Sequence, residues 1–148
     1  MILISHRGNR TGPNKDQENR PTFIDDTLNR GFDCEIDVRM ANDQLYLGHD
    51  EPQYKIDIGW LYKRRHKLWV HCKDLKSFEF LNNIHAPYLN LFFHESDLGV
   101  LTSFNYIWSS NVVKGGILVM PELFNTKPIA ETVGICSDYI VNYEKTKK

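Results

Sequence analysis

Asp33-Cys34-Glu35-Ile36-Asp37-Val38-Arg39 alternates polar and apolar side chains along a segment that reads as a strand. Successive side chains of a strand point to opposite faces, so Glu35, Asp37 and Arg39 share one face and the apolar residues share the other. The apolar face is expected to pack under helices. The two carboxylates, roughly 6–7 Å apart at Cα, can converge on one divalent cation. The alternative is a solvent-exposed strand face decorated with charges, which is common in antiparallel sheets.

Outward from this segment, short apolar runs bounded by polar turns predict many strands and a few short helices. Ala41-Asn42-Asp43 predicts a turn, so that the next strand returns as a hairpin. The helices are expected at Thr22–Arg30, Leu75–Asn83 and Pro128–Val133. The strands are expected at Ile2–Ser5, Cys34–Val38, Gln44–Gly48, Leu68–Cys72, Leu89–Phe93, Tyr106–Ser109, Ile117–Met120 and Tyr139–Asn142.

Strands alternating with helices favour an α/β fold with parallel strands joined by crossovers. The length of 148 residues predicts one domain, 1–148. An eight-fold β/α barrel usually needs about 200 residues or more. A barrel of this length therefore has to shorten its outer helices or replace them by loops.

Composition limits the classes of function. The chain has 18 basic and 19 acidic side chains and a formal net charge of −1, which argues against a nucleic-acid-binding surface. The apolar start Met1–Ile4 is too short for a signal peptide, and no run approaches the roughly 20 residues of a membrane span. We expect a cytoplasmic protein whose three cysteines are buried and reduced.

Two predicted strands end in histidine. His6-Arg7-Gly8 follows the first apolar run, and His49-Asp50 follows Leu45–Gly48. Charged groups at a strand end are costly in a core and natural at the mouth of a site, although a lone histidine there is more often structural. Two histidines beside a carboxylate pair suit phosphoryl transfer: one removes a proton, the other protonates the leaving oxygen, and a metal with an arginine stabilises the charge.

Together, His6-Arg7-Gly8, Glu18-Asn19, Glu35-x-Asp37 and His49-Asp50 resemble the N-terminal signature of the glycerophosphodiester phosphodiesterases. The similarity covers residues 2 to about 50. Weaker likenesses are Trp69–Lys73, placed like a strand on which the family has Glu and Lys, and Gly134–Tyr139, which looks like the last barrel strand.

The resemblance implies a compact, trimmed TIM-type (β/α) barrel with shortened outer helices, which hydrolyses phosphodiesters with one divalent cation. His6 and His49 become the acid/base pair, and Glu35 and Asp37 become metal ligands. The expected substrate is a small glycerol- or sugar-linked phosphodiester, and the oligomeric state is left open. The residues expected to contact substrate or phosphate are Arg7, Lys73, Arg39, Glu18 and His94; His94 reads equally well as a loop residue, with Asp97 as a helix cap.

The chain departs from the family pattern in two places. His71 replaces the third metal carboxylate, which favours Mn²⁺ or Zn²⁺ over Mg²⁺ or Ca²⁺ if His71 is a ligand. Glu51–Lys67 is a short connection where the family has an insertion, so a more open substrate pocket is expected. Two other functions stay open: a phosphate-binding module without turnover, and a phospholipase D-like lyase that releases a cyclic phosphate, since hydrolysis and cyclisation use the same residues. The related sphingomyelinases D share the two histidines and the Glu-x-Asp pair and imply a different head-group specificity.

Overall fold

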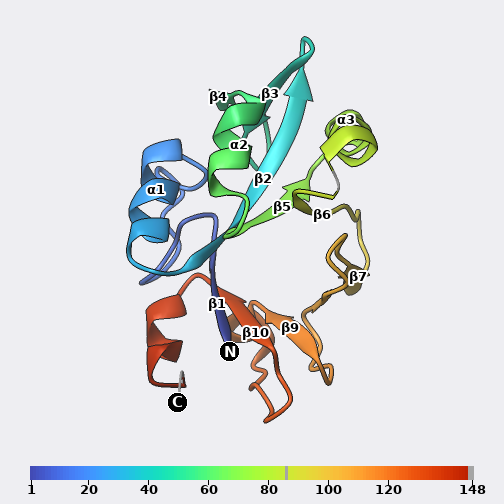
Figure 1. The fold of residues 1–148 in the computed structure, drawn as a ribbon. Coiled ribbons are helices and arrows are strands. Elements are labelled where there is room, and N and C mark those ends of the chain that lie inside the picture. Colours follow the sequence, from blue (N-terminus) through green and yellow to red (C-terminus); the bar gives the residue numbers. More distant parts are fainter. Residues whose placement is uncertain (86, 147–148) are drawn as a thin grey trace.

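The computed structural model describes residues 1–85 and 87–146. These residues form a mixed α/β fold, with one curled sheet of parallel and antiparallel strands and a few short helices (Figure 1). The strands are β1 (Ile2–His6), β2 (Asp33–Ala41), β3 (Gln44–Leu47), β4 (Tyr54–Ile56), β5 (Leu68–Cys72), β6 (Asn90–Phe92), β7 (Gly99–Leu101), β8 (Ile107–Ser109), β9 (Gly116–Val119) and β10 (Gly134–Ser137). The helices are α1 (Pro21–Asn29), α2 (Ile58–Arg64), α3 (Leu75–His85), α4 (Pro121–Phe124) and the 3₁₀ helix Ile140–Thr146.

The centre of the sheet is parallel, in the order β6-β5-β2-β1-β10-β9-β8. β3 pairs antiparallel with the C-terminal half of β2, and β4 pairs antiparallel with β3. At the other end of the sheet, β7 pairs antiparallel with β8. Between the described residues of β6 and β8 there is no ladder, but Ser103 donates its amide to the Leu91 carbonyl and bonds through its hydroxyl to Leu89 and Leu91. The structure is thus a curled half-barrel sheet.

Each face of the curl has its own apolar core. On the outer face, Cys34, Ile36 and Val38 pack with residues of α1, α2 and α3, as the alternation in β2 predicts. The inner face carries a second cluster, which contains Ile4, Trp69, Phe92, Trp108, Ile117 and Cys136. The cysteines Cys34, Cys72 and Cys136 are all free and buried, which confirms that expectation.

Local sequence signals account for most of the elements. Asp57 and Asp74 accept hydrogen bonds from the amides of Trp60 and Ser77 and so cap α2 and α3. The predicted hairpin is confirmed, since β3 returns antiparallel along β2 and its turn residues Asn42 and Asp43 both have positive φ. β4 and α2, which lie in the connection Glu51–Lys67, were not predicted from the sequence.

Two predictions near the C-terminal end are wrong. Residues 128–133 are not helical: 130–131 form a turn, in which the Ile129 amide donates to the Thr132 hydroxyl, and the short helix lies earlier as α4. Tyr139–Asn142 is not a strand, because the buried segment Gly134–Ser137 fills that place in the sheet between β1 and β9. No helix in the described ranges has both the length and the apolar character to cross a membrane.

Gly48, between β3 and His49, is the glycine at which an added side chain would clash most severely. Its φ is +155°, and a Cβ there would overlap the main-chain carbonyl of Glu51. We predict that Gly48→Ala lowers the free energy of unfolding by at least about 1 kcal/mol more than Gly31→Ala, measured by urea denaturation. Gly31 also has positive φ (+93°), but its Cβ would meet open space, so it isolates the steric effect. Equal losses would show that the Glu51 carbonyl moves freely.

Candidate functional site

A polar layer lies on the inner face of the curl, at the carboxyl ends of the parallel strands. His6 ends β1, Glu35 and Asp37 lie in β2, and His71 lies in β5. The strand register places His6 opposite Glu35 and Asp37 opposite His71. The carboxyl ends of parallel strands are where ligands bind in α/β folds.

Glu35, Asp37 and His71 form a group that could hold a metal ion, with one ligand atom of each within 4.8 Å of the others. The Nδ1 atom of His71 lies 3.7 Å from Glu35 Oε1 and 3.5 Å from Asp37 Oδ1. Glu35 and Asp37 are 2% and 0% exposed. Glu35 Oε2 and Asp37 Oδ1 are buried without a hydrogen-bond partner among the described residues, as expected of oxygens arranged to receive a cation.

Asp37 is oriented by its second oxygen. Oδ2 accepts a hydrogen bond from Asn19 Nδ2 (2.8 Å) and lies 2.9 Å from Arg7 Nε. Asn19 Oδ1 in turn accepts from the Asp37 amide (2.9 Å). Burial alone would raise the pKa of Asp37, but the contact with His71 and the charge of Arg7 outweigh it and hold that pKa well below its usual range. Asp37 is therefore an ionised carboxylate whose Oδ1 faces His71 without accepting a hydrogen bond.

His6 is oriented by Asp138, which follows β10. Its Nδ1 atom donates to Asp138 Oδ1 at 2.7 Å, and Nε2 lies 3.9 Å from Glu35 Oε2. Asp138 also accepts from Asn9 Nδ2 (2.8 Å), and its amide donates to Glu122 Oε1 (2.9 Å). Burial lowers the pKa of His6, but the hydrogen bond to Asp138 and the charge of Glu35 prevail, and the pKa lies above 6.5.

Glu18 and Arg7 line the same site. Arg7 Nη1 lies 3.2 Å from Glu18 Oε2, and Glu18 Oε1 accepts from Asn9 Nδ2 (2.9 Å). Arg7 thus bridges Asp37 and Glu18 through two of its three nitrogens. A guanidinium has five N–H donors, so this arrangement fixes Arg7 and still leaves donors for an anion.

His49 lies at the rim of the site and makes no described contact with His6. It lines a cavity of about 310 Å³ together with Arg7, Glu18 and Asn19. Its Nδ1 atom is 2.7 Å from Asp50 Oδ1. Arg39 donates to the main-chain carbonyls of Gly48 and His49 and so holds this loop against β2; its predicted contact with phosphate stays a prediction.

The other predicted residues lie on the β5–β6 side. The His94 ring stacks on His71 at 4.6 Å between centroids, and Phe92 stacks on His71 at 4.7 Å. The three rings are within 15° of parallel, which fixes the plane of the His71 ring. Burial, with the charges of His71 and Lys73, lowers the pKa of His94. Lys73 follows β5, where its amide donates to the Val38 carbonyl.

Asp138, Asn9 and Asn19 are site residues to which no role was assigned from the sequence. Asp138 carries the same signal as His6, a charged residue that directly follows a buried apolar strand. Asn9 and Asn19 lie in the polar stretch between β1 and α1, and both side chains turn inward to carboxylates.

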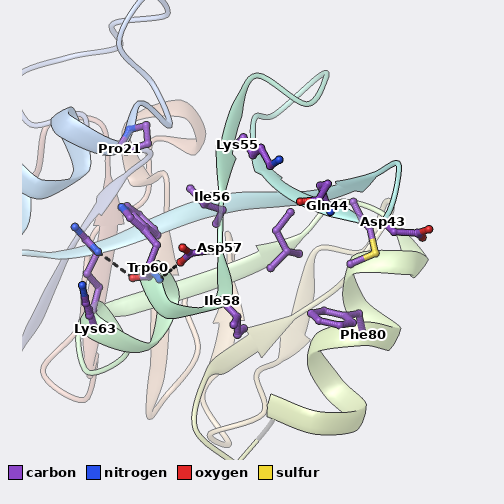
Figure 2. A pocket seen from close by; sticks show the side chains of 13 residues that line it. Pro21, Asp43, Gln44, Lys55, Ile56, Asp57, Ile58, Trp60, Lys63 and Phe80 are labelled. Carbon is purple, nitrogen blue, oxygen red and sulfur yellow. Dashed lines mark hydrogen bonds between the residues drawn. The ribbon is translucent and has the colours of Figure 1, made fainter.

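A cavity of about 690 Å³ lies elsewhere, among the β3–β4 hairpin, α2 and α3 (Figure 2). Trp60, Ile58 and Phe80 line it, and its carboxylate Asp57 already caps α2. It contains none of the predicted site residues. We therefore place the candidate site at the Glu35–Asp37–His71 group and not at this cavity.

Comparisons with protein-family models, curated proteins and solved structures gave no match.

We predict that the chain binds one divalent cation through this group. Glu35→Gln should weaken the affinity at least about tenfold in calorimetry, because it removes a negative ligand from a buried site. Glu79→Gln, on the exposed face of α3, is the control. Cation at about 100 times its dissociation constant should raise the free energy of unfolding of the wild type by about 2.7 kcal/mol. Equal affinity in both variants would exclude Glu35 as a ligand.

The histidine–carboxylate pair gives a second prediction. In Asp138→Asn the charged hydrogen-bond acceptor of His6 is lost while burial remains, so the pKa of His6 should fall. An NMR titration of the imidazole signals measures it. Asp50→Asn removes the equivalent partner from the half-exposed His49 and should leave the His6 titration unchanged. An unchanged His6 pKa in Asp138→Asn would mean that Asp138 does not orient this ring.

Proposed function

We propose that this chain is a metal-dependent phosphodiester hydrolase of the glycerophosphodiesterase type, on a trimmed (β/α) barrel scaffold. One observation carries the proposal. His6 is held at Nδ1 by Asp138, and its other nitrogen is directed at Glu35, a member of the buried Glu35–Asp37–His71 group. An acid/base group fixed beside a metal-ligating cluster is the combination that phosphoryl transfer requires.

Glu35 and Asp37 would hold the cation, with His71 Nδ1 as the third ligand atom. The atoms fit this role, since two carboxylate oxygens are buried and unpartnered and the imidazole nitrogen lies 3.5–3.7 Å from both carboxylates. Mn²⁺ and Zn²⁺ suit this mixed set of oxygen and nitrogen ligands. Mg²⁺ or Ca²⁺ would be bound mainly by the two carboxylates. The bound cation would supply positive charge to the phosphoryl oxygens.

The protein's own residues would handle protons and orientation. His6 would exchange a proton with the substrate through Nε2, because Nδ1 is committed to Asp138. The raised pKa of His6 favours the protonated ring, which suits it to donate a proton to the leaving oxygen. Arg7, fixed by Asp37 and Glu18, would orient the phosphate through its remaining donors.

His49 would be the second acid/base group, and it would approach the phosphate from the 310 Å³ cavity that it shares with Arg7. Its ring is 38% exposed, and its partner Asp50 is at the surface. A histidine at the rim suits the activation of a hydroxyl group that enters from solvent. Lys73 and His94, on the opposite side of His71, would complete the contacts to substrate.

The test is hydrolysis of bis(p-nitrophenyl) phosphate and of glycerophosphodiesters with Mg²⁺, Ca²⁺, Mn²⁺ or Zn²⁺. His6→Ala and His49→Ala should each lower kcat by about 10²–10⁴ without loss of cation binding, because each removes a proton-transfer group. Asp37→Asn should lower both the rate and the cation affinity. His66→Ala, an exposed histidine on the outer surface, is the control and should leave activity unchanged.

Full activity in His6→Ala would refute the acid/base assignment. If the wild type binds cation and phosphate but hydrolyses none of these esters, the protein is a binding module and not a hydrolase. Detection of a cyclic phosphate product by ³¹P NMR would show that a neighbouring hydroxyl of the substrate attacks the phosphorus, so that the reaction is cyclisation and not hydrolysis.

A further inference from the structure

The mouth of the curl has a polar half and an apolar half. The polar half is the site described above, on β1, β2 and β5. Across from it, Val119 ends β9 and Trp108 lies in β8, while Val100 comes from β7 and Phe124 from α4. These four residues, with Leu98 and His94, line a cavity of about 230 Å³.

The apolar cavity adjoins the candidate metal group through His94. His94 lines the cavity and stacks on His71 at 4.6 Å between ring centroids. Trp108 forms the cavity's inner wall and packs against Phe92 at 4.8 Å, and Phe92 stacks on His71. The His94 ring therefore borders both His71 and the cavity, and it is the contact that joins the two halves.

Most of the lining is apolar, although Asp97, Ser109 and Ser110 also line the cavity. Ser109 already donates its hydroxyl hydrogen to the Leu98 carbonyl and accepts from the Asn111 amide. Trp108 is 5% exposed, but Phe124 and Leu98, at the outer edge, are 53% and 66% exposed. Exposed apolar side chains around a small apolar cavity mark a surface that gains stability when a ligand covers it.

We propose that this cavity is a subsite for an apolar, ring-sized substituent of the phosphodiester, so that the preferred substrate is an aryl or short alkyl phosphodiester and not a glycerol or sugar diester. This inference rests on the proposed function and specifies the substrate of the same site. A volume of 230 Å³ is below that of a pocket for a whole drug-sized ligand and suits one substituent. The Nδ1 atom of His94 is buried without a partner among the described residues, and it lies at the boundary between the two halves as a contact for the ester oxygen.

Two neighbouring residues of α4 supply a matched pair of variants. Phe124 lines the cavity, whereas Leu123 is 70% exposed and does not. Both side chains lie largely outside the core, so truncation of either should leave the fold intact. Phe124→Ala and Leu123→Ala therefore separate loss of the subsite from loss of an exposed apolar side chain.

The first measurement is the affinity of diphenyl phosphate and dimethyl phosphate in the presence of Mg²⁺, by calorimetry on the His6→Ala protein. We expect diphenyl phosphate to bind about tenfold more tightly than dimethyl phosphate, because a phenyl ring moves from water into the apolar cavity. Adding Phe124→Ala should remove most of this preference without changing the affinity for dimethyl phosphate, and Leu123→Ala should change neither. Equal affinity for the two esters, or equal effects of the two variants, would overturn the subsite.

A second measurement needs neither metal nor turnover. Phenol titrated into the ¹⁵N-labelled wild type should shift the amide signals of Val100 and Val119 and the indole signal of Trp108. Shifts there in a protein that hydrolyses no ester would leave the subsite standing and reject the proposed hydrolase. Hydrolysis without such shifts would leave the hydrolase standing and reject the subsite.

Discussion

The burial of two carboxylates, Glu35 and Asp37, inside the curl of the sheet is the constraint on which the rest of the site depends. Buried like charges a few ångströms apart are unstable unless positive charge and hydrogen bonds surround them. The chain provides Arg7 on one side and His71 on the other, each within ion-pair distance of Asp37. Asn19 donates to Asp37 Oδ2, and Oδ1 accepts no hydrogen bond from the described residues. Arg7 and Asn19, in the polar stretch between β1 and α1, thus stabilise the buried charge of Asp37 in β2.

The same sheet explains why one polar layer can form there. Parallel strands bring their carboxyl ends to one rim, and the register sets His6 against Glu35 and Asp37 against His71. Below this layer, the inner face is aromatic and aliphatic, with Trp69, Phe92 and Trp108 in contact. That floor excludes water from beneath the carboxylates and strengthens their electrostatic interactions. A rigid apolar base and a polar rim are the conditions under which a small set of charges keeps a fixed geometry.

Alternation in Asp33–Arg39 was enough to predict which residues of β2 face inward, because a strand shows its two faces directly in sequence. The β2–β3 hairpin was equally readable from its turn residues. Asp138 and Asn9 were not assigned, because their roles come from contacts between β10 and the loop after β1, and no local pattern records a contact across 129 residues. Tyr139–Asn142 failed as a strand since its apolar residues pack from a 3₁₀ helix, which short apolar runs do not distinguish from a strand.

The central claim is that Glu35, Asp37 and His71 bind one divalent cation together. The most direct measurement is anomalous diffraction at the manganese absorption edge, from crystals of the wild-type protein soaked in Mn²⁺. We expect one strong anomalous peak bounded by Glu35, Asp37 and the Nδ1 atom of His71. A peak elsewhere, or an undisturbed contact of His71 with both carboxylates at saturating Mn²⁺, would contradict it.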